Sequence, residues 1–167
     1  MFSELAVLLM SENLLEGEIP TEISNMSNLE IMDLSQNKLI GSIPKFTSGS
    51  LWFLYLQQNN LSGSIPYEFP EDSLQLLDLK ENKFSGKISN WMDKLSELRV
   101  LLLGGNNFEG EIPNQLCRLK KIDIMVLSRN MLNASIPYCF RNMSFGMRQY
   151  AGDDDDDDGP VLNCHLV

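Results

Sequence analysis

The sequence lacks a long hydrophobic run. No run of about 18 apolar residues occurs in the chain, whereas a membrane-spanning helix needs about 20. Residues 1–4 are too few for a signal peptide, and the leucines that follow belong to a repeat. Because the chain begins inside that repeat, we expect further sequence upstream, and these absences do not predict a cytosolic protein.

Histidine and cysteine are scarce. The one histidine is His165, and the three cysteines are Cys117, Cys139 and Cys164. No paired Cys–Cys or Cys–His spacing of the zinc-binding kind occurs, and His165 has no regularly placed Ser or Asp partner. A glycine-rich loop for phosphate binding is also missing. We therefore predict no metal site, no cofactor and no enzymatic activity.

Basic residues are outnumbered by acidic ones. The chain has 13 Lys and Arg residues against 23 Asp and Glu residues, a formal net charge of −10. This balance argues against a nucleic-acid partner, which would require a basic stripe. Six of the acids form the run Asp153–Asp158, which we expect to be solvated and disordered because like charges repel. The run lacks the interleaved Gly and the distal Glu of a calcium loop.

What the chain does have is a repeat of 22 to 24 residues. The clearest copy is Leu98–Pro113, LRVLLLGGNNFEGEIP, whose leucine spacing suits a short strand with one buried face. One such unit has no partner face, so it requires neighbours that stack on it. We divide the chain into an N-terminal edge (1–4), six repeats (5–140) and a non-repeat tail (141–167). The repeats begin near residues 5, 29, 51, 74, 98 and 122.

One asparagine recurs at the same place in every copy. A buried Asn must have its amide satisfied, and here it can donate to backbone carbonyls of its own and neighbouring turns. We predict a structural ladder along the repeats. Its members are Asn13, Asn37, Asn59, Asn82, Asn106 and Asn130.

The stacked copies predict an α/β-type repeat solenoid with a concave parallel sheet. Strands are expected near 7–11, 31–35, 53–57, 76–80, 100–104 and 124–128. A glycine after each Asn should set a bend and a second extended segment, with Ala134 making the sixth bend less regular. The convex side should be mostly irregular, with about one helical turn at 90–95 and at 114–119. Loops are expected at 45–50 and 67–73.

Side chains between the leucines should point out of the concave face. Exposed aromatic residues and Arg carry much of the binding energy at interfaces, which favours Trp52 and Tyr55 as contacts. Phe53 fits better in a half-buried apolar column. The open face should leave the carboxylates solvated, with no pocket that raises their pKa. The ligand-contact candidates are Asp33, Trp52, Tyr55, Gln57, Asp78, Lys80, Arg99 and Arg129.

The unit LxxLxLxxNxLxGxIPxxL resembles the plant-specific class of extracellular leucine-rich repeats, and Leu51–Pro66 matches it well. Asn114–Lys121 and Ile136–Met147 look like the last repeats before the non-repeat island of plant receptor-like proteins. The resemblance implies a secreted ectodomain, one membrane span, no kinase, and a co-receptor kinase partner in defence or development. Signal peptide, cysteine-containing cap, later repeats and span are not in this chain, so we interpret it as an internal or truncated piece of the ectodomain.

Two other interpretations stay open at this stage. A short secreted repeat protein that inhibits a cell-wall-degrading enzyme would use the same concave face. A truncated product without a function of its own is the third. In the first two cases the partner is a protein, peptide or glycan that the sequence does not name, and the location is the cell surface or the extracellular space.

The compartment also bears on two kinds of modification. Four Asn-x-Ser motifs are candidate glycosylation sites and favour the secretory route; they begin at Asn25, Asn60, Asn133 and Asn142. Cys117 and Cys139 each follow an Ile-Pro pair at similar corners of neighbouring turns, offset by two places. They form either a disulfide or two free thiols in a reducing compartment.

Overall fold

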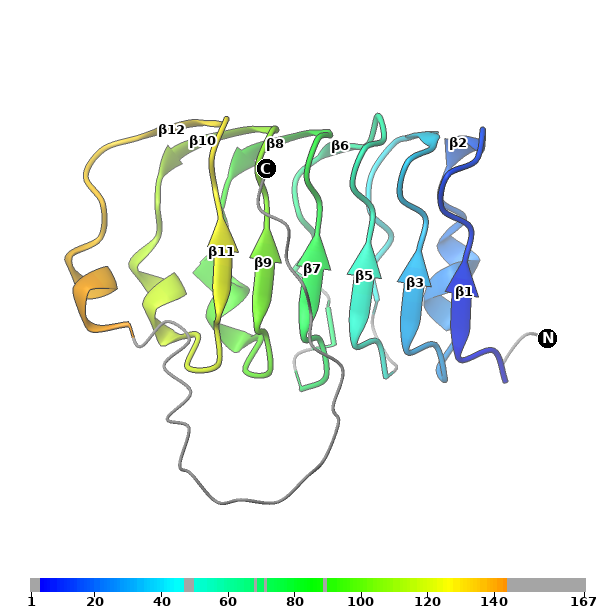
Figure 1. Cartoon of the computed structure of the whole chain (residues 1–167), viewed down its shortest axis with the longest axis horizontal. Coiled ribbons are helices and arrows are strands. Elements are labelled where there is room, and N and C mark those ends of the chain that lie inside the picture. Colours follow the sequence, from blue (N-terminus) through cyan, green and yellow to red (C-terminus); the bar gives the residue numbers. More distant parts are fainter. Residues whose placement is uncertain (1–3, 47–49, 68, 71, 89, 144–167) are drawn as a thin grey trace, which may run out of the picture.

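The structure is a computed structural model that describes residues 4–46, 50–67, 69–70, 72–88 and 90–143. In this part, six parallel strands form one sheet in the order β1-β3-β5-β7-β9-β11, one strand for each predicted repeat (Figure 1). Every strand pairs with its neighbour in exact sequence order, so the chain winds as a solenoid. The strands are β1 (Val7–Leu9), β3 (Ile31–Asp33), β5 (Phe53–Tyr55), β7 (Leu76–Asp78), β9 (Val100–Leu102) and β11 (Ile124–Val126).

These strands start where the sequence predicts but end two residues earlier. The backbone turns soon after the third residue, because the residue before each ladder Asn has a positive φ of 52–69°. Stacking nevertheless continues beyond the strands, as the bond from Met10 N–H to the Asp33 carbonyl, 2.8 Å, shows for the first turn. The short strands therefore reflect a tight turn and not a loss of contact between repeats.

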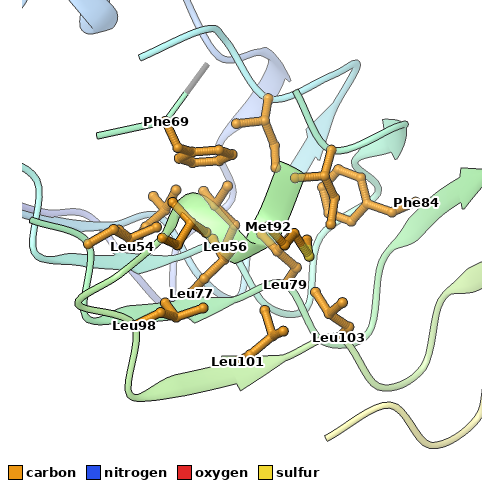
Figure 2. Close-up of a cluster of buried hydrophobic side chains, with 14 of the residues drawn as sticks. Leu54, Leu56, Phe69, Leu77, Leu79, Phe84, Met92, Leu98, Leu101 and Leu103 are labelled. Atoms are coloured by element: carbon orange, nitrogen blue, oxygen red, sulfur yellow. The ribbon is translucent and has the colours of Figure 1, made fainter. Parts of the chain in front are cut away.

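The middle residue of each strand points into the core. Leu54, Leu77 and Leu101 are fully buried, and so are Leu56, Leu79 and Leu103, two residues further along each turn (Figure 2). Phe84 and Phe108 fill the opposite side of the core with stacked rings, 6.5 Å between centroids. The repeats thus form one continuous hydrophobic core along the solenoid.

A second set of strands follows the ladder asparagines. The predicted second extended segments are present. Each begins before the recurring glycine or its equivalent Ala134, and Gly86 and Gly110 lie inside their strands. Ala134 has a φ of 68°, close to the 78–88° of the equivalent glycines, so the sixth turn keeps the bend. Strand β12 ends one residue before Ala134. The strands are β2 (Glu16–Glu18), β4 (Lys38–Ile40), β6 (Ser62–Gly63), β8 (Lys83–Lys87), β10 (Asn107–Glu111) and β12 (Met131–Asn133).

Short 3₁₀ turns lie on the convex side. The predicted turns at 90–95 and 114–119 are confirmed as η2 (Asn90–Lys94) and η3 (Asn114–Arg118). Two more, η1 (Thr21–Asn25) and η4 (Tyr138–Asn142), were not predicted. The described residues of 45–50 and 67–73 carry no helix, as expected, and the stacked rings of Phe46 and Phe69 fill the core there.

The ladder asparagines connect neighbouring turns. Asn106 Nδ2 donates to the carbonyls of Leu79 and Leu103, at 2.9 and 3.1 Å, and its Oδ1 accepts from the Phe84 N–H at 3.0 Å. Asn37, Asn59, Asn82 and Asn130 make the same kind of bonds. Asn13 is exposed, and its bonds to described residues stay within its own turn. Each ladder amide from the second repeat onward satisfies backbone groups of two turns.

Replacing Asn106 by alanine should lower the free energy of unfolding by about 1–3 kcal/mol, because buried backbone groups lose their partner. Asn107→Ala is the matched control, since the neighbouring Asn107 side chain is exposed. Chemical denaturation of the two variants measures the difference. Equal midpoints and slopes for the two variants would contradict a structural role for the ladder.

A disulfide joins η3 and η4. The Cys117 and Cys139 Sγ atoms are 2.02 Å apart and the two Cα atoms are 6.0 Å apart. The two-place offset in sequence is therefore compatible with a bridge between neighbouring turns. Cys164 and the Asp153–Asp158 run, with its predicted disorder, lie outside the described residues. In the described part, no helix is long and apolar enough to cross a membrane.

Candidate ligand-binding face

The concave sheet presents two rows of side chains. The pairing register aligns the third residues of the strands across the sheet, which we call the contact row: Leu9, Asp33, Tyr55, Asp78, Leu102 and Val126. The first residues form an apolar floor row: Val7, Ile31, Phe53, Leu76, Val100 and Ile124. Phe53 is half-buried in the floor row, as predicted, and only the row's two ends, at 44% and 40%, are exposed.

Asp33 stands on β3 with one oxygen bound and one available. Its Oδ1 accepts from the Ser35 N–H at 2.9 Å and from the Ser35 hydroxyl at 2.6 Å. These bonds fix the carboxylate where β3 ends. Within the described residues, Oδ2 has no hydrogen-bond partner and Asp33 has no ion pair, so this oxygen can accept a bond from a ligand.

Tyr55 lies between two carboxylates in the contact row, paired in register with Asp33 on one side and Asp78 on the other. Burial raises the pKa of its phenol, and the charges of Asp33 and then Asp78 raise it further. The phenol therefore stays protonated in a negative field. Such a ring presents both a hydrogen-bond donor and a π-face to a ligand.

Asp78 is buried, with 4% of its surface exposed. Burial raises the pKa of its carboxyl, although the Lys80 N–H donates to Oδ1 at 3.0 Å and Lys80 Nζ lies 3.5 Å from Oδ2. The expectation that the open face leaves every carboxylate solvated is therefore wrong for Asp78. Neighbouring side chains on the curved sheet withdraw it from water, which a strand register alone does not show.

The raised pKa of Asp78 predicts a pH-dependent stability difference. The folded protein binds this proton more readily than the unfolded chain, so the Asp78 contribution to stability falls as pH rises from 3.8 through the raised folded value. Asp78→Asn removes the titration and keeps an oxygen for the Lys80 N–H. The variant should gain stability relative to the parent as pH rises through that window. Denaturation at a series of pH values tests this, and a constant difference would contradict it.

Gln57 corrects a second expectation. The sequence predicts an exposed side chain, but Gln57 is half-buried, and its Oε1 atom is buried without a hydrogen-bond partner in the part of the chain that the structure describes. An unpaired buried acceptor costs free energy. Gln57 follows Tyr55 by two residues, so this acceptor lies on the Tyr55 turn of the solenoid.

The remaining candidates lie around the contact row. Trp52 precedes β5 and is 40% exposed, and Lys80 pairs with Asp78 as described. Arg99 pairs with Asp123, with Nη1 and Oδ2 3.2 Å apart. Arg129 pairs with Glu81 two repeats away, and the pair passes over Gly105, where an added Cβ would collide with the Glu81 carboxylate. Both arginines therefore already have acidic partners, which lowers their value as free contacts.

Sequence reasoning missed two acids on this side of the molecule. Glu30 occupies the place before β3 that Trp52 occupies before β5, and Glu12 is exposed in the positive-φ position after β1. Glu12 accepts a bond from Gln36 Nε2 at 3.3 Å, and neither acid has an ion pair among the described residues. Their position in the repeat, equivalent to Trp52 and Arg129, was the signal that could have identified them.

The candidate glycosylation sites lie elsewhere. Asn25 and Asn142 end the convex turns η1 and η4, Asn133 ends β12, and Asn60 precedes β6. All four side chains are exposed, and none belongs to a concave strand. Sugars at these places would leave the contact row uncovered.

Comparison with known proteins adds to this geometry. The Leucine Rich Repeat family model matches residues 28–49, 50–71, 73–95 and 97–119. Receptor-like protein 35 of Arabidopsis thaliana is 39% identical over 97 residues, which cover 56% of this chain and 10% of that protein. This chain therefore spans about a tenth of that relative's length.

Solved structures show the same architecture. A plant peptide hormone receptor, RGFR1 in complex with RGF2, has a TM-score of 0.78 and 32% identity, covering 82% of this chain and 22% of that one. The Arabidopsis receptor kinase HAESA, in complex with the peptide hormone IDA and the co-receptor SERK1, has a TM-score of 0.77 and 35% identity, covering 81% of this chain and 23% of that one. The chain belongs to the leucine-rich repeat family and has the plant extracellular, receptor-like type of repeat.

Proposed function

We propose that this chain is the ligand-recognition part of a plant cell-surface receptor-like protein without a kinase, and that its contact row holds a peptide or a peptide segment of a protein. The observation that carries this is the composition of the contact row. Asp33, Tyr55 and Leu102, on the second, third and fifth strands of the sheet, are not needed for the core or the ladder. Such half-buried aromatic, charged and apolar groups provide binding energy at interfaces.

The comparisons support the same role for the parent protein. The solved relatives named above hold peptide hormones, and one of them is also bound to a co-receptor. By analogy, the parent protein would lie on the extracellular side of the plasma membrane and signal in defence or development through a co-receptor kinase. This role needs no catalytic group in the chain.

Glycosylation of the exposed asparagines is part of this proposal. Protein secreted from plant cells should carry glycans at Asn25, Asn60, Asn133 and Asn142, because these side chains are exposed within acceptor motifs. Peptide mapping by mass spectrometry, with and without enzymatic removal of the glycans, identifies the occupied sites. Secreted protein with all four asparagines unmodified would contradict a glycosylated ectodomain.

Selection of peptides on the immobilised full chain tests the binding role. A random library of about twelve residues is long enough, because such a peptide spans about 40 Å when extended and β1 to β11 span about 24 Å. We expect selected peptides to bind the chain and to lose at least about tenfold in affinity with Tyr55→Ala, as contact aromatics do.

Ile40→Ala is the matched control, because Ile40 is 48% exposed but lies on β4, away from the concave sheet. It should leave the affinity unchanged. A failure to select any peptide, or equal losses with the two variants, would contradict binding at the contact row.

A further inference from the structure

We propose that the concave face selects an extended segment with a basic side chain and an apolar side chain four residues apart. The basic group sits at Asp33 and Tyr55, and the apolar group sits at Leu102 and Val126. This inference rests on the proposed function and adds the chemistry of the ligand. Three observations carry it: the distribution of unpaired charge, the composition of the contact row, and the spacing of the strands.

Charge is balanced on one half of the face and unbalanced on the other. In repeats four to six, Asp78, Glu81 and Asp123 each have a cationic partner in Lys80, Arg129 and Arg99. In repeats one and two, Glu12, Glu30 and Asp33 have no ion pair within the described part of the chain. The unbalanced half therefore presents a negative charge that a cationic group would complement.

Next to these acids, the concave face also carries the aromatic ring of Tyr55 and the amide of Gln57. Tyr55 adjoins Asp33 in the contact row, and a cation near both is attracted by the carboxylate and by the π-face of the ring. The buried Gln57 Oε1 has no hydrogen-bond partner among the described residues, so this part of the face also carries an unpaired acceptor. The two unpaired acceptors here, Asp33 Oδ2 and Gln57 Oε1, favour a donor-bearing Lys or Arg.

The other half of the contact row is apolar. Leu102 and Val126 are neighbours in register and half-buried, above the floor residues Val100 and Ile124. Gly104 has no side chain to cover them; an added Cβ there would lie 3.2 Å from Val126 Cγ1. Apolar surface of this kind favours an aliphatic or aromatic side chain. It offers a glycan little hydrogen bonding, so the arrangement favours a peptide.

Strand spacing fixes the distance between the two groups. Neighbouring strands are about 4.8 Å apart, so three strand steps separate the Asp33–Tyr55 pair from the Leu102–Val126 pair by about 14 Å. An extended peptide rises about 3.3 Å per residue, and residues i and i+4 lie on the same side about 13 Å apart. The match holds for either direction of the peptide.

Synthetic peptides test the inference on the full chain. The probe is an extended, uncharged carrier peptide with Lys and Leu four residues apart, made in both orders. Companion peptides replace Lys by Gln, replace Leu by Ser, or separate the pair by two or six residues. We expect each change to weaken the affinity of the peptide about tenfold. At high salt the Lys→Gln change should weaken the affinity less, because salt screens the attraction between Lys and the Asp33 carboxylate.

Protein variants locate the two groups. Asp33→Asn keeps the acceptor for Ser35 and should abolish the preference for Lys over Gln, whereas Glu109→Gln, an exposed acid on β10, should keep it. Leu102→Ser should abolish the preference for Leu over Ser, whereas Ile40→Ser should not. Circular dichroism and melting of each variant confirm that it is folded.

The outcomes separate the two proposals. Library peptides that bind in a Tyr55-dependent way but show no preference for a basic and an apolar residue four apart would overturn this inference and leave the proposed function standing. The same holds if Asp33→Asn and Glu109→Gln behave alike. If no peptide binds in a Tyr55-dependent way, both proposals fail.

Discussion

Replacing Phe84 by alanine should lower the free energy of unfolding by about 3–5 kcal/mol, the range for a fully buried phenylalanine. Phe84 is fully buried on β8 (Figure 2). Its ring stacks on that of Phe108 in the next turn, with ring planes 10° apart. Its removal leaves a cavity and takes away the ring contact between two repeats. The stacked turns on both sides limit how far the cavity can close.

Urea denaturation followed by circular dichroism measures this effect. Leu14→Ala is the control, because Leu14 is 76% exposed and its truncation opens no cavity. It should change the unfolding free energy by no more than about 0.5 kcal/mol. A loss below about 1 kcal/mol for Phe84→Ala would mean that the core at this turn is not packed as the structure shows.

Most of the fold could be predicted from the repeat, because each leucine and each asparagine in it has one structural role. Leu101 has to be buried and Asn106 has to bond backbone groups on two turns, so their spacing determines the turn of the solenoid. Strand starts follow from this register. The convex turns η1 and η4 were not predicted, although each begins directly after an Ile-Pro pair, as the predicted η3 does. This recurring pair was the signal that could have identified them.

The contact row shows where prediction from sequence stops. Register alone places Asp33, Tyr55 and Asp78 side by side, and the structure has them in that register. The burial of Asp78 and the unpaired acceptor of Gln57 depend on the curvature of the sheet and on side-chain conformations. The pairing of Arg129 with Glu81 across two repeats also depends on a neighbour, the side-chain-free Gly105.

These differences change which candidates are worth testing. Arg99 and Arg129 rank high from residue type, but each already has an acidic partner. Asp33 ranks no higher than Asp78 from sequence, yet its free Oδ2 makes it the better contact. Binding free energy depends on what a group loses as well as on what it gains, and Asp33, unlike the two arginines, has no ion pair to break within the described residues.

Removal of the disulfide should lower the free energy of unfolding by about 3 kcal/mol, because the bridge closes a loop of 22 residues in the unfolded chain. The bridge ties the sixth turn to the fifth. The sixth turn has its strands, β11 and β12, at the ends of their sheets, and Ile136 and Tyr138 are exposed by 75% and 76%. Among the described residues this turn packs against a neighbour on one side only, so it depends on the covalent link more than an interior turn does.

The test compares the parent chain with the double variant Cys117→Ala/Cys139→Ala, with and without a thiol reductant. Both cysteines are replaced, because a single substitution would leave the other cysteine of the bridge as a free thiol. Denaturation should show the parent falling to the level of the double variant when reductant is added, while the variant itself does not respond. Hydrogen exchange should show the loss of protection concentrated in residues 124–143, since local stability follows local contacts. Equal stability of the two proteins without reductant, or a reductant effect that persists in the variant, would show that this bridge does not stabilise the last turn.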